Sequence, residues 1–253
     1  MIFLKIFVLD KYRFSCILLA LFSLALFLVA SLSPTAEENK LLPIYSVDTK
    51  DKVVSVTFDS AWTAEDIPLI LETLQKHNCR ATFFVVGSWA EKYPESVKLI
   101  FDSGHEVAGH SYNHAHYNSL TAEELKNDMD MCDKVIKNIT GVTVPIFRAP
   151  YGEYNNTVVN TAMNSGRTLI QWDVDSLDWK DLNEEEMTKR ILPKIKNGSI
   201  ILFHNGTKYT ASALDGILTK ISNKGYSFKS AGDLIYKDNY ETDHTGRQKK
   251  PDR

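Results

Sequence analysis

The stretch Val53-Val54-Ser55-Val56-Thr57-Phe58 decides the expected fold, and Asp59-Ser60 ends it. Its apolar and β-branched residues are typical of a buried strand in a parallel sheet. Apolar residues at helical spacing follow over residues 64–77, and a second apolar run follows over residues 81–86. Strand and helix patterns then alternate along the chain, which predicts an α/β fold with a parallel sheet or barrel.

Capping residues mark two later helices of this alternation. Thr121 with Glu124 forms one capping-box pattern, and Asn183 with Glu186 forms another. Gly141 is suited to end the first of these helices, which is expected to reach about residue 139. The remaining expected helices lie near residues 95–101, 157–165 and 211–223, and the remaining expected strands over 146–148, 168–174 and 199–203.

The N-terminal segment differs in composition from the rest. Lys5, Lys11 and Arg13 precede residues 14–32, which carry no charge and are long enough to span a bilayer. The positive flank predicts a cytoplasmic N-terminus and export of the residues after the apolar run. We favour an uncleaved anchor, although small residues near position 30 also suit a cleaved signal peptide. The expected boundaries are a signal peptide or membrane anchor over 1–32, a linker over 33–51, a folded domain over 52–236 and a polar tail over 237–253.

Charge and cysteine content exclude some classes of function. The formal net charge of the 253 residues is −3, so a nucleic-acid partner is not expected. Cys16, Cys79 and Cys132 form no C-x-x-C pair, so neither a disulfide framework nor a cysteine metal site is indicated. We interpret Cys79 and Cys132 as small buried residues.

Polar residues recur at the ends of the expected strands. His110 and His114 form an H-x-x-x-H pattern, which by itself fits two solvated histidines as well as a metal site. In parallel α/β folds, however, sites form at the carboxyl ends of the strands. The residues at or just after such ends are Asp59, His110, Arg148, Asp175 and His204. This recurrence predicts one shared site.

Five motifs in order resemble those of the polysaccharide deacetylases, the NodB-homology domain of carbohydrate esterase family 4. The resemblance spans roughly residues 52–234. The motifs are Thr57-Phe58-Asp59-Ser60, His110-Ser111-Tyr112-Asn113-His114, Phe147-Arg148-Ala149-Pro150-Tyr151-Gly152, Asp175-Ser176-Leu177-Asp178-Trp179 and Ile201-Leu202-Phe203-His204. The resemblance implies an irregular (β/α)7-type barrel that hydrolyses acetyl groups from N-acetylated sugars or, in some members, from O-acetylated xylan.

The resemblance also implies a metal and an acid–base pair. His110 and His114 would bind a divalent metal, most often zinc in this family. Asp59 would be the general base, tethered by Arg148, and His204 would be the general acid.

Other positions would support this pair. Asp178 would keep the general acid protonated, and the backbone N–H of Tyr151 would meet the oxyanion. Trp179 and Leu202 would form apolar walls around the acetyl methyl group.

Ser60 departs from the family pattern, which has a metal-binding aspartate there. A hydroxyl is a weaker ligand for a dication than a carboxylate. Three alternatives stay open. Activity persists with a looser metal, as the Asp59-Ser60-Ala61-Trp62 pattern of sporulation-type deacetylases of endospore-forming bacteria would suggest. Asn113 or His116 completes the metal shell. Or the domain binds glycan without catalysis.

We therefore expect an extracytoplasmic, metal-dependent deacetylase of cell-wall polysaccharide, with peptidoglycan as its substrate and the N-terminal segment as its membrane contact. The alternatives are a catalytically impaired glycan-binding protein, or a deacetylase of chitin oligomers or O-acetyl xylan. We expect a monomer.

Overall fold

The computed structural model describes Ser15, Leu19, Phe22, Ser23 and residues 40–251 except 144. The chain divides into two compact units, residues 1–39 and 40–253. Nearly all of the expected anchor or signal segment over residues 1–32 lies outside the described residues, so that expectation stays a prediction. Within the described part, no helix combines the length and the apolar character needed to cross a membrane.

The second unit is built on a parallel sheet with the strand order β6-β5-β4-β3-β2-β8-β7, and β9 pairs with β2 beside this path. The strands are β2 (Val53–Ser60), β3 (Thr82–Val85), β4 (Glu106–Gly109), β5 (Ile146–Phe147), β6 (Thr168–Leu169), β7 (Val174–Asp175), β8 (Ile200–His204) and β9 (Ser227–Phe228). This confirms the predicted α/β fold with a parallel sheet. The architecture is an α/β half-barrel of parallel strands.

One expected strand, over residues 168–174, is divided between the two edges of this sheet. Its first part is edge strand β6, and its last part joins the opposite edge strand, β7. Between them, Ile170 bridges to Ile44, and the Asp173 carboxylate accepts a hydrogen bond of 2.9 Å from the Ile200 backbone N–H. The segment therefore links two strands that stand at opposite ends of the strand order, which an apolar run in the sequence does not reveal.

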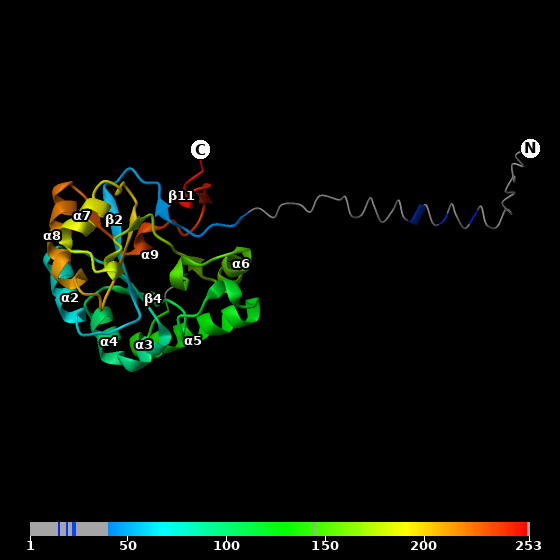
Figure 1. Cartoon of the computed structure of the whole chain (residues 1–253), viewed down its shortest axis with the longest axis horizontal. Coiled ribbons are helices and arrows are strands. Elements are labelled where there is room, and N and C mark those ends of the chain that lie inside the picture. The colour runs from blue at the N-terminus through cyan, green and yellow to red at the C-terminus, as the bar shows by residue number, and fades with distance from the viewer. Residues whose placement is uncertain (1–14, 16–18, 20–21, 24–39, 144, 252–253) are drawn as a thin grey trace, which may run out of the picture. The chain divides into compact units, whose positions relative to one another are not determined.

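Helices lie around the outside of the strands (Figure 1). They are α2 (Ile67–Lys76), α3 (Gly87–Lys92), α4 (Pro94–Asp102), α5 (Ala122–Thr140), α6 (Asn156–Asn164), α7 (Glu184–Ile191), α8 (Thr210–Asn223) and α9 (Ala231–Leu234). Both predicted capping boxes are present, at the starts of α5 and α7. Gly141 ends α5 with a left-handed backbone, φ 79°. Helix α3 was not predicted, because six residues are too few to show a helical period.

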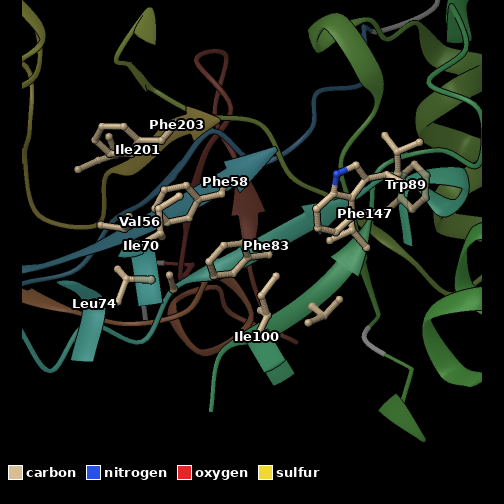
Figure 2. Packing of buried hydrophobic residues seen from close by; sticks show 14 of the residues in the cluster. Val56, Phe58, Ile70, Leu74, Phe83, Trp89, Ile100, Phe147, Ile201 and Phe203 are labelled. Carbon is tan, nitrogen blue, oxygen red and sulfur yellow. The ribbon is translucent and has the colours of Figure 1, made fainter. Parts of the chain in front are cut away.

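The alternation of side chains along β2 separates the core from the interior of the half-barrel. Val54, Val56 and Phe58 pack into the large core between sheet and helices, where the Phe58 ring stacks on Phe83 at 4.8 Å (Figure 2). Val53, which has the opposite parity in the strand, belongs to a second, smaller core cluster. The same period of two places Asp59 on the interior side, away from the helices.

The expected linker and tail both contribute strands. β1 (Ser46–Val47), β11 (Arg247–Lys249) and β10 (Glu241–Thr242) form a separate three-stranded sheet in that order. The chain before β1 also binds the edge of the half-barrel, since the Ile44 N–H donates to the Leu169 carbonyl at 2.9 Å.

A close approach at Gly198 completes this attachment. The Val47 N–H donates to the Gly198 carbonyl at 2.9 Å, and a Cβ at Gly198 would lie 1.9 Å from the Val47 carbonyl oxygen. Only glycine fits at this position.

Candidate active site

Asp59 and His204 lie side by side at the carboxyl ends of β2 and β8, where they are register partners. Both face a cavity of about 420 Å³. Its lining is mainly histidine, carboxylate and aromatic side chains: Asp59, Ala61, Trp62, His110, His114, Tyr151, Trp172, Asp175, Trp179, Leu202 and His204. The structure thus brings together four of the five strand-end residues, and the fifth, Arg148, lies buried in contact with Asp59.

Asp59 is held as an ionised carboxylate by Arg148. The Arg148 Nη1 lies 2.7 Å from Asp59 Oδ1, and the same nitrogen donates to Thr57 Oγ1 at 2.9 Å. Burial alone would raise the pKa of Asp59, but attraction to His110, when that imidazole is protonated, and to Arg148, together with the Arg148 hydrogen bond, lowers it below the usual value. Asp59 is therefore suited to accept a proton only when a reacting group is brought against it.

Arg148 itself is fixed from several sides. Its Nη2 donates to the Gln171 carbonyl at 3.1 Å. Its guanidinium lies 4.1 Å from the centre of the Phe84 ring and 5.4 Å from that of Trp172. These cation–π contacts and hydrogen bonds leave the guanidinium little freedom, so the position of Asp59 is fixed as well.

Asp178, which is buried outside the cavity lining, orients His204. Its Oδ1 lies 2.8 Å from the imidazole Nδ1, and its Oδ2 accepts from the His204 backbone N–H and from Thr210 Oγ1, both at 2.6 Å. Burial alone would lower the pKa of His204, but the hydrogen bond and charge of Asp178 raise it above the usual value. Sequence reasoning did not identify Thr210, because a threonine at a helix start looks like an ordinary capping residue.

The backbone carbonyl of Arg148 sets the tautomer of His110. It lies 2.9 Å from the imidazole Nδ1, and a carbonyl only accepts, so Nδ1 carries the proton. The other nitrogen, Nε2, therefore presents a lone pair, and it lies 3.4 Å from Asp59 Oδ2. Two acceptors that face one another at this distance fit a cation between them.

His114 lies close to His110 and is also neutral. The two ring centres are 5.1 Å apart, and the Tyr151 ring lies edge-on to His114 at 4.5 Å. Burial, followed by the charge of His110, lowers the pKa of His114 to about 4. Two neutral imidazoles are suitable metal ligands. Among the described residues, no group of three or more His, Cys, Asp or Glu side chains is placed to hold a metal ion.

Asp128 on α5 fixes the loop that carries both histidines. Its Oδ1 accepts from the Tyr112 N–H at 2.9 Å and from the Tyr117 hydroxyl at 2.6 Å. The loop needs this support because Ser111 and His114 both have positive φ, 69° and 56°. Sequence reasoning missed Asp128, although its place on the apolar face of α5, three residues after Leu125, is an available signal.

Ser60 is fully buried, and its Oγ finds no hydrogen-bond partner among the described residues. It lies outside the cavity lining. The two candidates for completing a metal shell also lie outside that lining: Asn113 is exposed, and the His116 Nδ1 lies 2.8 Å from Glu153 Oε1.

The remaining predicted site residues all line the cavity. Leu202 is buried, whereas Trp179 and Tyr151 are largely exposed at 51% and 57%. Tyr151 has φ 60°, which for a tyrosine is a strained conformation in a turn.

Comparisons with known proteins agree with this fold and motif set. Residues 46–170 match the family model described as polysaccharide deacetylase. The chain belongs to this family. It is 36% identical over 184 residues to the peptidoglycan-N-acetylglucosamine deacetylase of Listeria monocytogenes, covering 73% of this chain but only 39% of that protein. It is 30% identical over 200 residues to a peptidoglycan-N-acetylmuramic acid deacetylase of Bacillus subtilis, covering 76% and 74%.

A solved structure of a family 4 carbohydrate esterase pseudoenzyme from Bacillus anthracis is also similar. It has a TM-score of 0.73 and 34% identity, covering 76% of this chain and 68% of that one. A mutant of that pseudoenzyme, described as having restored enzymatic activity, superposes with the same TM-score, 0.73.

Proposed function

We propose that this chain is a metal-dependent hydrolase that removes acetyl groups from N-acetylated cell-wall polysaccharide, with peptidoglycan as its substrate. One observation carries the proposal. Asp59 and His204 are register neighbours that face one cavity, and their surroundings shift their pKa values in opposite directions. A carboxylate kept ionised beside an imidazole kept protonated is the arrangement that general base and general acid catalysis requires.

The proposed reaction breaks an amide bond. Asp59 removes a proton from a water molecule as the oxygen attacks the acetyl carbonyl carbon. The Tyr151 backbone N–H donates to the carbonyl oxygen as negative charge develops there. His204 then donates its proton to the sugar nitrogen as the C–N bond breaks, which releases acetate and a free amine. Leu202 and Trp179 enclose the acetyl methyl group.

His110 and His114 are the residues that would hold the metal. His110 Nε2 directs a lone pair toward Asp59, and both imidazoles are neutral. These features fit a divalent cation, and we propose that the ion is zinc. Such an ion would polarise the acetyl carbonyl and make a bound water more acidic. Among the described residues, the carboxylate beside His110 is that of Asp59, and the neutral Ser60 would add no second negative charge next to it.

The substrate assignment rests on the relatives. The Listeria and Bacillus proteins are named as peptidoglycan deacetylases that act on N-acetylglucosamine and N-acetylmuramic acid. Peptidoglycan lies outside the cytoplasm, so we place this domain there, held by the N-terminal segment as a single-pass anchor or secreted after its cleavage. The apolar methyl pocket and the acid–base pair would also serve chitin oligomers or O-acetyl xylan.

Acetate release tests the activity. The purified domain, supplied with Zn²⁺, would be incubated with peptidoglycan, N-acetylchitooligosaccharides and acetylated xylan. Asp59→Asn should abolish release while leaving the thermal unfolding profile intact. Asp173→Asn is a control that removes a carboxylate outside the cavity, and it should keep turnover. Absence of acetate from every substrate would refute the proposal.

A non-catalytic glycan-binding protein is the second candidate. It is favoured by one observation, the neutral Ser60 beside a site whose solved neighbour from Bacillus anthracis is described as a pseudoenzyme. This candidate predicts cell-wall binding that is unaffected by EDTA and by Asp59→Asn. The enzyme predicts chelator-sensitive acetate release.

A further inference from the structure

Trp62 is an exposed aromatic residue at the mouth of the cavity. It follows β2 by two residues, lines the cavity and is 51% exposed. Its ring centre lies 5.4 Å from that of His204, with the rings tilted by 35°. A single exposed tryptophan is not unusual on a protein surface. What distinguishes Trp62 is how firmly the chain around it is held.

Two loops are tied together at Trp62, the loop after β2 and the loop after β8. Asn205, which is fully buried, donates from its Nδ2 to the Thr63 carbonyl. The Gly206 N–H donates to Asp66 Oδ2 at 2.7 Å. Buried polar groups thus fix the backbone next to an exposed aromatic ring.

Gly206 allows the two loops to approach closely. It has φ 73°, and a Cβ there would lie 2.8 Å from Thr63 Cγ2 and 3.3 Å from Trp62 Cβ. Any larger residue would displace the loop that carries the ring. Because the same β8 loop begins at His204, the ring and the imidazole are held in one fixed arrangement.

We propose that Trp62 is a stacking platform for a pyranose ring of the glycan chain, on the side of the cavity where His204 protonates the leaving amine. This inference rests on the proposed function, since it takes the substrate to be a polymeric saccharide. The apolar C–H face of a pyranose complements an aromatic face, and a fixed ring binds it at little entropic cost.

The ring of Trp179, which also lines the cavity, is less available for stacking on a sugar. The Lys180 ammonium lies 4.9 Å from the centre of its ring. The platform therefore predicts that Trp62, rather than Trp179, carries most of the stacking energy for the glycan.

Binding of a defined glycan tests the platform. The probe is a peptide-free tetrasaccharide from peptidoglycan glycan strands, titrated by calorimetry into protein that carries Asp59→Asn so that no turnover occurs. Adding Trp62→Ala should raise the dissociation constant about tenfold, and Trp62→Phe should restore most of the affinity. Leu69→Ala is the matched control, because Leu69 is 48% exposed and lies outside the cavity.

Three results would contradict the stacking role of Trp62. An unchanged dissociation constant in Trp62→Ala overturns the platform, as does failure of the Asp59→Asn protein to bind the tetrasaccharide. An equal loss in Leu69→Ala also overturns it, because the effect would then not belong to the cavity. Failure of the proposed function is separate: wild-type protein would release no acetate while Trp62→Ala still weakened glycan binding.

Discussion

Arg148 and Asp59 form an ion pair of 2.7 Å whose side chains are 0% and 7% exposed. Such a pair is expensive to bury, and removing one partner leaves the other without compensation. Asp59 lines the cavity and Arg148 lies buried against it, so the ion pair fixes the position of the proposed base. Its stability and its chemistry are therefore linked.

Arg148→Met should destabilise the domain by about 3–5 kcal/mol, because Asp59 would remain buried without its cation. It should also reduce turnover strongly, since the carboxylate is no longer held toward the cavity. Urea unfolding and acetate release measure the two effects. Arg167→Met is the control: Arg167 pairs with Asp130 and Asp133 at 2.7 Å outside the cavity, so its loss should lower stability and spare turnover.

Asp178→Asn should move the alkaline limb of the activity profile to lower pH. A general acid works only while protonated, and Asp178 raises the pKa of His204, so activity is retained below that raised pKa and lost as pH rises through it. Without the carboxylate the loss begins at lower pH. The measurement is initial rate against pH for wild type and Asp178→Asn. Asp173→Asn should keep the wild-type limb, and a shared shift would contradict the assignment.

His105 should make the domain lose stability in mild acid. Burial, followed by the charge of Arg80, lowers the pKa of His105 from 6.5 to about 4, and its Nδ1 accepts from the Ala81 N–H at 3.2 Å. Between these two values the unfolded chain binds a proton that the folded chain does not, so stability falls as pH drops from 6.5 toward 4. At ~1.4 kcal/mol per unit, the loss is roughly 3 kcal/mol.

His105→Asn tests this, because an amide oxygen can accept the Ala81 hydrogen bond without titrating. Urea unfolding of both proteins at pH 7 and pH 4.5 should show a smaller difference between the two pH values in the variant. Equal differences would show that protonation elsewhere causes the loss.

The sequence predicted the position of the site better than its shape. Strand ends are readable from apolar runs, so the pattern of the chain alone places Asp59, His110 and His204 at one edge of the sheet. Two of the strands, β6 and β7, have only two residues each, and they pair with β5 and β8, which lie on different sides of β2 in the sheet order. No local pattern carries that information.

The residues that hold the site residues in place could not be predicted from the sequence. Asp128 and Thr210 act through contacts across 11 to 32 positions of the chain, and each looks like an ordinary polar residue on a helix. The H-x-x-x-H motif, in contrast, can be read directly from the sequence. Whether it forms a complete metal site depends on Ser60, which the structure places outside the cavity lining.

Ser60→Asp should make stability depend on metal. The Ser60 side chain is fully buried, and its Oγ has no hydrogen-bond partner among the described residues. A carboxylate there would be a buried charge, which costs several kcal/mol unless a cation compensates it. Without metal the variant should therefore unfold at a lower temperature than wild type. With Zn²⁺ it should gain more, because metal that binds only the folded state stabilises it by mass action.

Thermal unfolding with EDTA and with increasing Zn²⁺ measures this for wild type, Ser60→Asp and His110→Ala. We expect metal affinity to be tightest in Ser60→Asp, intermediate in wild type and weakest in His110→Ala, and turnover need not follow this order, because it depends on how water lies against Asp59. Ser55→Asp is a matched control, since the Ser55 hydroxyl is equally buried in β2 and also has no partner among the described residues, but it lies near the start of the strand, at the opposite end from Asp59. It should lose stability with no recovery on adding Zn²⁺. If Ser60→Asp behaves like this control, the residue does not face the metal; if His110→Ala binds Zn²⁺ as wild type does, the histidine pair is not a metal site.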